Sequence, residues 1–158
     1  MLRDRMARLR PSKGDHLLLY GRGKIGKQMA RIASAVPERF IAYGCSGQPA
    51  ENIDHKQISY DEFAADLASC KAVVCTGGQQ LIGEARYFGK PMLVVPIPNQ
   101  HEQEINARYA RKERIGDYCP LGRLTAARMR NFLRQEFLEK PSTNGVDETL
   151  ELLGISYG

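Results

Sequence analysis

Short apolar runs alternate along this chain with stretches in which apolar residues recur every three or four positions. The run HLLLY (16–20) predicts a buried strand, and the helical spacing from Ile25 to Val36 predicts a helix that ends near Pro37. The run RFIAYG (39–44) predicts the next strand. The chain therefore opens with a strand, a helix and a second strand, which is the building unit of a parallel sheet.

The alternation continues along the rest of the chain. Buried strands are expected at 71–76 and 92–96, with a weaker one at 56–59. Helices are expected around 63–70, 79–88, 101–113 and 129–137, and a short one at 147–153. This order favours an α/β fold of the Rossmann-like type, a parallel sheet with helices on both faces. Ligands of such sheets bind outside the carboxyl ends of the strands.

Length and composition indicate one soluble globular domain, with 158 residues, 42% of them hydrophobic and 26% charged. The net charge is +5, but residues 1–13 carry +4 of it (five Lys or Arg against one Asp), which leaves +1 elsewhere. A basic lead-in is not a basic binding face, so we expect no nucleic-acid partner. The four cysteines lack the spacing of a metal site, and we expect reduced thiols.

The chain is expected to divide into three segments. Residues 1–14 form a basic linker or a lead-in helix, residues 15–140 the Rossmann-like domain, and residues 141–158 a tail that can hold a short helix. A lead-in helix would be amphipathic and would contact a membrane or a partner. The charged start does not resemble a secretion signal, so we expect a cytoplasmic protein, with the inner face of a membrane as a further location.

The hexapeptide GRGKIG (21–26) follows the first predicted strand. Glycines at this point let backbone N–H groups approach a phosphate, with Gly21, Gly23 and Lys24 as the candidate contacts. Binding of NAD would also need an acidic residue after the second strand, and residues 42–49 contain none. Arg22 would suit NADP, and a tight turn without a ligand is the structural alternative. The loop predicts phosphate binding but not a dinucleotide.

The segment 73–107 carries a more specific pattern. It has a glycine turn at Gly78, a glutamate six residues later at Glu84, Gly-x-Pro at 89–91, and Glu-Gln-x-x-Asn-Ala at 102–107. This pattern resembles the donor-binding signature of GT-B glycosyltransferases. The likeness is to the C-terminal domain of family 28, which includes the lipid II-forming N-acetylglucosaminyltransferases, and of related bacterial glycosyltransferases. The resemblance implies that residues 15–140 are a donor-binding domain, one half of a GT-B fold.

The resemblance also implies roles for single residues. Glu84 matches the glutamate that binds both ribose hydroxyls, and the backbone near Ser59 and Tyr60 lies where the family holds uracil. Glu102 and Gln103 match the pair that reads the hydroxyls of the sugar. The whole expected donor-binding set is Gly21, Gly23, Lys24, Tyr60, Thr76, Gly77, Gly78, Gln79, Gln80, Glu84, Glu102 and Gln103.

Some positions depart from the family pattern, and others are interpreted as structural residues. Leu81 replaces a hydroxyl found in many members, and Thr76 stands where the glucosyl subfamily has a histidine. His101 is interpreted as a loop residue rather than a catalytic base, and Asn106 as a residue that holds the loop or helix in place. Glu84 is expected to be exposed near a helix start.

The resemblance implies an inverting, metal-independent glycosyltransferase that takes its sugar from a nucleotide, with UDP as the favoured carrier. It implies no cofactor and no metal ligands, and it leaves the catalytic base unassigned. Because GT-B enzymes have two domains, activity should require an N-terminal acceptor domain or a partner subunit. The alternatives are a domain of a UDP-sugar 2-epimerase and a non-catalytic nucleotide-binding module, including one that binds NAD(P).

Overall fold

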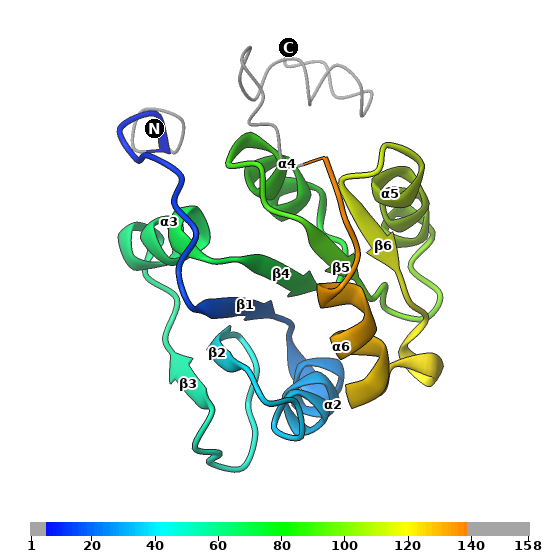
Figure 1. The fold of residues 1–158 in the computed structure, drawn as a ribbon. Coiled ribbons are helices and arrows are strands. Elements are labelled where there is room, and N and C mark those ends of the chain that lie inside the picture. The colour runs from blue at the N-terminus through cyan, green and yellow to red at the C-terminus, as the bar shows by residue number, and fades with distance from the viewer. Residues whose placement is uncertain (1–5, 139–158) are drawn as a thin grey trace.

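The computed structural model describes residues 6–138, which form a six-stranded sheet covered by helices (Figure 1). Across the sheet the strands follow the order β3-β2-β1-β4-β5-β6, and every neighbouring pair is parallel. Their bounds are His16–Tyr20 (β1), Arg39–Tyr43 (β2), Ile53–Lys56 (β3), Ala72–Cys75 (β4), Met92–Val94 (β5) and Gly116–Tyr118 (β6). This order confirms the predicted Rossmann-like sheet.

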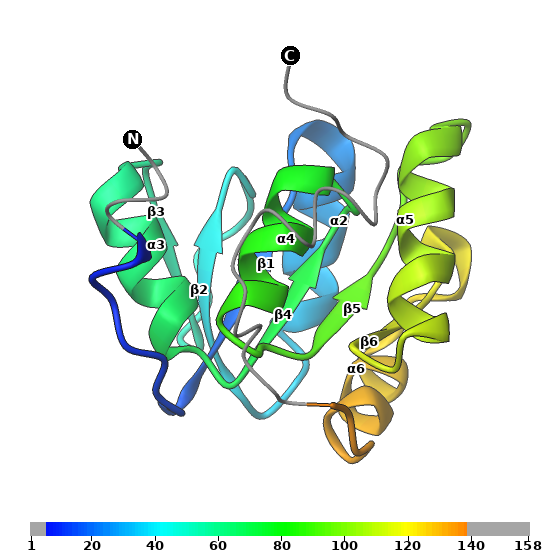
Figure 2. The same cartoon turned by 90° about the horizontal axis from the view of Figure 1, so that it is seen from above.

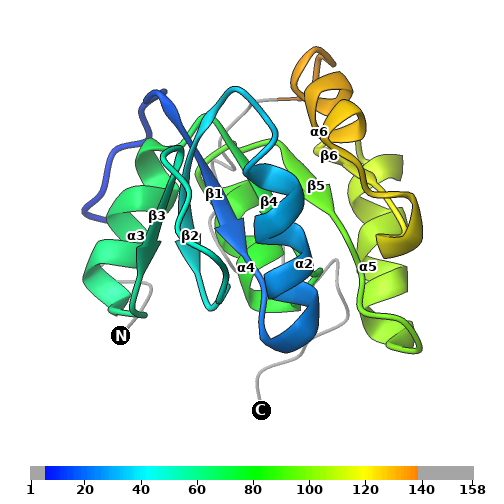
Figure 3. The ribbon, with the colours of Figure 1, turned by 90° about the horizontal axis from the view of Figure 1, so that it is seen from below.

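The helices divide between the two faces of the sheet. One face carries α3 (Tyr60–Ser69), α4 (Gln79–Tyr87) and α5 (His101–Lys112), which stand together in Figure 2. The opposite face carries α2 (Gly23–Ala33) and α6 (Ala126–Leu133), which are nearest the viewer in Figure 3. A 3-10 turn, η1 (Leu121–Arg123), leads into α6.

Each face of the sheet has its own buried apolar layer. Leu18 of β1 and Val73 of β4 belong to the layer under α3, α4 and α5. Leu17 and Leu19 of β1 belong to the layer under α2 and α6. Because successive strand residues point to opposite faces, an apolar run such as HLLLY supplies both layers at once. The central strands therefore read as continuous apolar runs in the sequence.

The third strand lies three residues earlier than predicted, at Ile53–Lys56 rather than 56–59. Ile53 is buried and pairs in register with Phe40 of β2, whereas Ile58 is 47% exposed. The predicted range was wrong, because the inward apolar residue of this strand is Ile53, which lies outside that range. At a sheet edge a single buried side chain is enough to fix the strand.

The last described helix and the last strand also differ from the prediction. α6 ends at Leu133, and the chain then turns so that Phe137 packs on Phe132, with ring centroids 5.2 Å apart. The apolar spacing over 129–137 therefore comes partly from a segment that folds back on the helix. β6 was not predicted because its sequence, Gly-Asp-Tyr, has no apolar run. The helix predicted at 147–153 lies outside the described residues.

The residues that precede β1 lie along α3. The backbone N–H groups of Ser12 and Gly14 donate to the carbonyls of Ala68 and Ser69, at 2.9 and 2.7 Å. Met6 is 2% exposed and belongs to the same apolar layer as α3. Residues 7–14 contain no helix and are mostly exposed, and Leu9 is the apolar residue among them that packs on this layer. Residues 1–5 of the predicted lead-in lie outside the described part.

Candidate functional site

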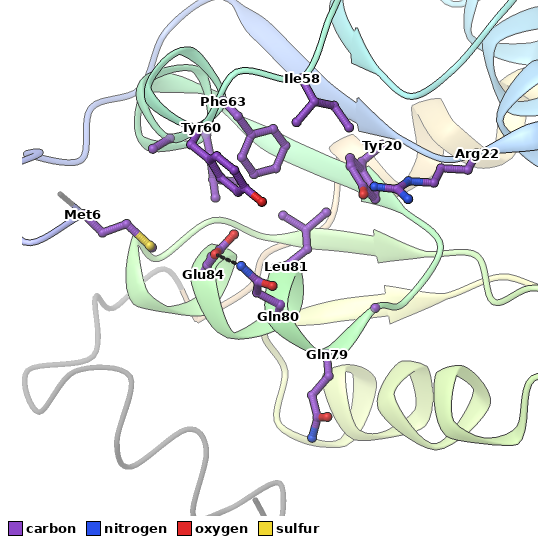
Figure 4. Close-up of a pocket in the computed structure, with 13 residues that line it drawn as sticks. Met6, Tyr20, Arg22, Ile58, Tyr60, Phe63, Gln79, Gln80, Leu81 and Glu84 are labelled. Atoms are coloured by element: carbon purple, nitrogen blue, oxygen red, sulfur yellow. Dashed lines mark hydrogen bonds between the residues drawn. The ribbon is translucent and has the colours of Figure 1, made fainter. Parts of the chain in front are cut away.

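A cavity of about 270 Å³ opens at the carboxyl ends of β1 and β4, between α3 and α4 (Figure 4). Its apolar wall comes mainly from Tyr20, Ile58, Phe63, Leu67 and Leu81, with Met6 at one end. Its polar groups come from Arg22, Tyr60, Gln79, Gln80 and Glu84. The cavity thus has an apolar side and a polar side, at the edge of the sheet where ligands of this fold class bind.

Glu84 is buried in the wall of this cavity, so the expectation that it is exposed is wrong. It is 7% exposed because it shares the inner face of α4 with Leu81, three residues earlier. Gln80 Nε2 donates to Glu84 Oε1 at 3.0 Å, and the other carboxylate oxygen has no donor among the described residues. Burial raises the pKa of the Glu84 carboxyl, and the hydrogen bond from Gln80 lowers it to a smaller extent.

The first glycine loop, Gly21–Gly26, joins β1 to α2. A Cβ atom on Gly26 would lie 2.7 and 2.8 Å from the carbonyl carbon and oxygen of Gly21, so α2 can approach the strand only with a glycine there. Gly23 has a φ of +59°, which favours glycine, but open space surrounds its missing side chain. Gly21 and Gly26 thus serve close packing, and Gly23 serves the turn. Lys24 is exposed and does not line the cavity.

The second glycine loop, Thr76–Gly78, joins β4 to α4. Gly77 has a φ of +93°, and a Cβ atom there would lie 2.9 Å from Val94 Cγ1 and 3.2 Å from the carbonyl oxygen of Gln103. Asn106 Nδ2 of α5 donates to the carbonyl of Gly77 at 3.1 Å. This bond confirms the interpretation of Asn106 as a residue that holds the loop. Gly78 is the N-cap of α4 and lines the cavity. The backbone N–H groups of the first turn of α4, which have no partner within the helix, therefore lie at the cavity.

The start of α5 lies beside the second glycine loop and carries the predicted sugar contacts. Glu102 is exposed, and Gln103 is partly buried. Gln103 Oε1 accepts a hydrogen bond from the backbone N–H of Ile97 at 2.9 Å, so this oxygen shapes the loop before α5. The amide nitrogen of Gln103 has no acceptor among the described residues. The sequence did not reveal this contact, because a hydrogen bond from the backbone to a side chain leaves no pattern in the sequence.

A second cavity, of about 340 Å³, lies at the carboxyl ends of β5 and β6. The loop 96–101 lines it together with Glu104 and Tyr118. The Tyr118 hydroxyl donates to Glu104 Oε1 at 2.8 Å, which ties β6 to the first turn of α5. The carboxyl edge of the sheet thus has a hollow before α5 as well as the one before α4.

Five of the twelve predicted donor-binding residues line the first cavity: Tyr60, Gly78, Gln79, Gln80 and Glu84. Thr76 and Gly77 are buried in the second glycine loop behind it, and Glu102 and Gln103 lie at the start of α5. In the first glycine loop, the residue that lines the cavity is Arg22 rather than the three predicted there. Sequence reasoning had weighed Arg22 only as an NADP contact.

No group of three or more His, Cys, Asp or Glu side chains suited to a metal ion occurs within residues 6–138. All four cysteines are free and buried. Burial raises the pKa of the Cys75 thiol to about 11. The same range of residues contains no helix that is long and apolar enough to cross a membrane.

Comparisons with known proteins agree with this architecture. The family model described as Glycosyl transferase family 1 matches residues 1–136. The UDP-N-acetylglucosamine--N-acetylmuramyl-(pentapeptide) pyrophosphoryl-undecaprenol N-acetylglucosamine transferase of Bordetella petrii is 29% identical over 96 residues, 60% of this chain and 26% of that protein. The crystal structure of Acinetobacter baumannii MurG superposes with a TM-score of 0.61 and 15% identity, over 97% of this chain and 52% of that one. The glycosyltransferase VinC in complex with dTDP gives a TM-score of 0.55 at 19% identity, over 92% and 38%.

The parallel sheet and its edge cavity therefore define a domain of the GT-B glycosyltransferase fold, of the C-terminal kind. More particularly, the chain belongs to glycosyl transferase family 1, since the family model covers residues 1–136 of its 158. The chain spans between about a quarter and a half of the length of these similar proteins.

Proposed function

We propose that this chain is the donor-binding domain of an inverting, metal-independent glycosyltransferase whose donor is a nucleotide sugar, with UDP as the favoured carrier. One observation carries the proposal. A buried carboxylate, Glu84, stands in the wall of a cavity at the carboxyl edge of the sheet with one oxygen uncommitted to the described protein. Such a group is costly to bury unless a ligand supplies donors. The two hydroxyls of a ribose supply two.

The cavity accommodates the nucleoside end of such a donor. Phe63 and Leu81 offer apolar surface to a base, and the Tyr60 ring stands at the rim (Figure 4). Glu84 lies on the opposite side of the same cavity, one turn beyond Gln80. A base held between α3 and α4 would therefore place its ribose toward the Glu84 carboxylate. This arrangement suits a nucleoside with free 2′ and 3′ hydroxyls.

The diphosphate would then lie at the start of α4. Gly78 is the N-cap of this helix, and its first turn contains no acidic residue. The unpaired N–H groups and the positive end of the helix dipole favour an anion there. The sugar would follow toward the start of α5, where Glu102 and the amide nitrogen of Gln103 offer an acceptor and a donor.

In the transfer, the bond between the sugar C1 and the diphosphate oxygen breaks, and its electron pair stays on the nucleoside diphosphate. An acceptor hydroxyl bonds to C1 from the opposite face and gives its proton to a base. We place the acceptor site and this base outside the described residues, in a second domain or a partner subunit. The contribution of this chain is to orient the donor and stabilise the charge on the leaving diphosphate.

Calorimetric titration of the full chain with UDP, dTDP and NAD tests the proposal. We expect UDP to bind more tightly than dTDP, which lacks the 2′ hydroxyl that Glu84 would accept, and more tightly than NAD. Addition of EDTA should leave UDP binding unchanged. Tighter binding of NAD than of UDP would contradict the proposal.

The Glu84→Gln variant examines the ribose contact directly. It keeps the shape of the side chain but loses the negative charge, so UDP affinity should fall by about tenfold or more. The loss should be smaller for 2′-deoxy-UDP, because one of the two hydroxyl donors is already missing. An equal loss for both nucleotides would mean that Glu84 does not bind the ribose.

A further inference from the structure

The segment that leads into β1 connects the first cavity with the opposite edge of the sheet. Residues 6–14 run beside α3 (Figure 1). Next to β1, the backbone N–H groups of Ser12 and Gly14 donate to carbonyls at the end of α3. Lys90, which is 6% exposed, donates from Nζ to the Ser12 carbonyl. This end of the segment is therefore fixed to the body of the domain.

The other end of the segment is held by apolar contacts. Met6 is 2% exposed and lines the first cavity together with Tyr60 and Phe63 of α3. Figure 4 shows the Met6 side chain extending toward the cavity. Leu9 packs on the same apolar layer but does not line the cavity. A ligand in this end of the cavity would therefore touch the segment through Met6.

The stretch between the two ends has few ties to the domain. Arg8 and Arg10 are exposed, and within residues 6–138 neither forms an ion pair. The Leu9 N–H donates to the Met6 carbonyl at 3.0 Å, a bond that stays inside the segment. Detachment of Met6 and Leu9 would therefore free the chain as far as Ser12.

We infer that residues 6–14 are a strap whose Met6 end is fixed by a nucleoside in the first cavity, so that the strap opens less often when the donor is bound. This inference rests on the proposed function, because the occupant is the nucleoside of the donor. Two linked equilibria influence each other equally, so a nucleoside that holds the strap is itself bound more tightly when the strap is closed. The basic lead-in would then report donor occupancy to the acceptor-binding part, which the proposed function places in a second domain or a partner subunit.

Limited proteolysis with trypsin tests the strap. The bond between Arg8 and Leu9 lies between the two fixed ends, and its cleavage requires the surrounding residues to leave the domain, so its rate follows the population of the open strap. The bond after Arg134, an exposed residue that does not line the cavity, is the reference. Both rates are followed by mass spectrometry on the full chain alone, with saturating UDP and with inorganic pyrophosphate. Calorimetry measures UDP binding separately.

Three variants separate the cavity contact from a general loosening of the strap. Met6→Ala removes the side chain that lines the cavity, and Met6→Leu keeps an apolar group of similar volume. Leu9→Ala is the matched control, because Leu9 packs on the same layer without lining the cavity.

We expect UDP to slow cleavage after Arg8 by about fivefold or more, the lower end of the usual coupling between two sites. Cleavage at the reference bond should not change. Pyrophosphate should protect neither bond, because Met6 lies at the end of the cavity proposed for the nucleoside. Met6→Ala should lose most of the protection and bind UDP more weakly by a comparable factor, and Met6→Leu should keep both. Leu9→Ala should be cleaved faster without UDP and still be protected by UDP.

Unchanged cleavage after Arg8 in a wild-type chain that binds UDP would overturn the strap and leave the proposed function standing. Full protection of Met6→Ala by UDP, or equal protection of the wild type by pyrophosphate, would also overturn it, because Met6 would then not be the link. Equal slowing at both bonds would have the same consequence, since UDP would then stabilise the whole domain. If calorimetry shows no UDP binding, the proposed function fails and the strap fails with it.

Discussion

The two glycine loops follow neighbouring strands, β1 and β4, yet they are stabilised in different ways. In the first loop, Gly26 of α2 packs directly on Gly21, which follows β1. The second loop is held by a third element, because Asn106 and Gln103 of α5 contact Gly77. The first loop is therefore fixed by β1, α2 and the end of β2, whose Tyr43 carbonyl accepts from the Gly21 N–H at 3.3 Å, whereas the second is fixed in part by the more distant helix α5.

This difference has a consequence for the proposed site. α5 also carries Glu102 and Gln103 at its start, so the same helix supports the diphosphate loop and presents the expected sugar contacts. A displacement of α5 would change both regions together. The first loop, with Arg22, would keep its conformation. Measurements of stability and of ligand binding on variants of each loop can show whether the two loops respond separately.

The largest effect is expected in the first loop, from Gly26→Ala. The added Cβ would lie 2.7 Å from backbone atoms of Gly21, so α2 must move away from the sheet. We expect a loss of about 3 kcal/mol in the free energy of unfolding, at the upper end for an overpacked core. Urea denaturation followed by circular dichroism gives this value.

Gly23→Ala is the matched control in the same loop. Its φ of +59° costs an alanine about 1 kcal/mol, but the added methyl group meets open space. If Gly23→Ala proves costlier than Gly26→Ala, the loop depends on its turn conformation rather than on close packing, and the contrast between the two loops is lost.

Much of the fold was accessible from the sequence because the central strands bury both faces. The runs 16–20, 39–44 and 71–76 are continuous and apolar, and each corresponds to a strand in the predicted place. The edges were harder. β3 is fixed by Ile53 alone, and β6 is three residues long with an aspartate at its centre. Short edge strands carry too few inward residues to show a period.

The candidate site divides in the same way. The glycine turn and the glutamate six residues later have a fixed spacing, so Glu84 and the start of α4 were identified from the sequence. The burial of Glu84 was missed because it depends on how α4 rotates against the sheet. The position of Arg22 in the cavity wall depends on the backbone of the first loop and on Gly44. Neither is encoded in a local pattern.

An intermediate effect is expected from Asn106→Ala, which removes the tie between α5 and the second loop. Gly77 is buried, and its carbonyl oxygen would lose the hydrogen bond that Asn106 Nδ2 donates at 3.1 Å. We expect a loss of about 2 kcal/mol in the free energy of unfolding, the cost of an unsatisfied buried polar group. UDP affinity should fall as well, and both quantities can be measured by thermal shift with and without UDP.

Ile105→Ala is the control on the same helix, since Ile105 is 65% exposed and its loss should cost about 0.5 kcal/mol or less. A less stable Asn106→Ala protein that still binds UDP like the wild type would contradict the comparison. The second loop would then keep its shape without help from α5.

The smallest effect, and the one most diagnostic of a ligand site, is expected in the stability of Glu84→Gln without ligand. Burial raises the pKa of Glu84 in the folded chain, so the folded state binds its proton more tightly than the unfolded state does. The free energy of unfolding contributed by this group therefore falls as pH rises through the window between the unfolded and the folded pKa. Glutamine carries no charge and can still accept from Gln80, so the variant should unfold at a slightly higher temperature than wild type at neutral pH. The difference should vanish below the ordinary pKa of a glutamate, and thermal melts at several pH values would show it. A gain in stability together with weaker UDP binding is the behaviour of a residue retained for a ligand, whereas a loss of stability at neutral pH would make Glu84 a structural residue of α4.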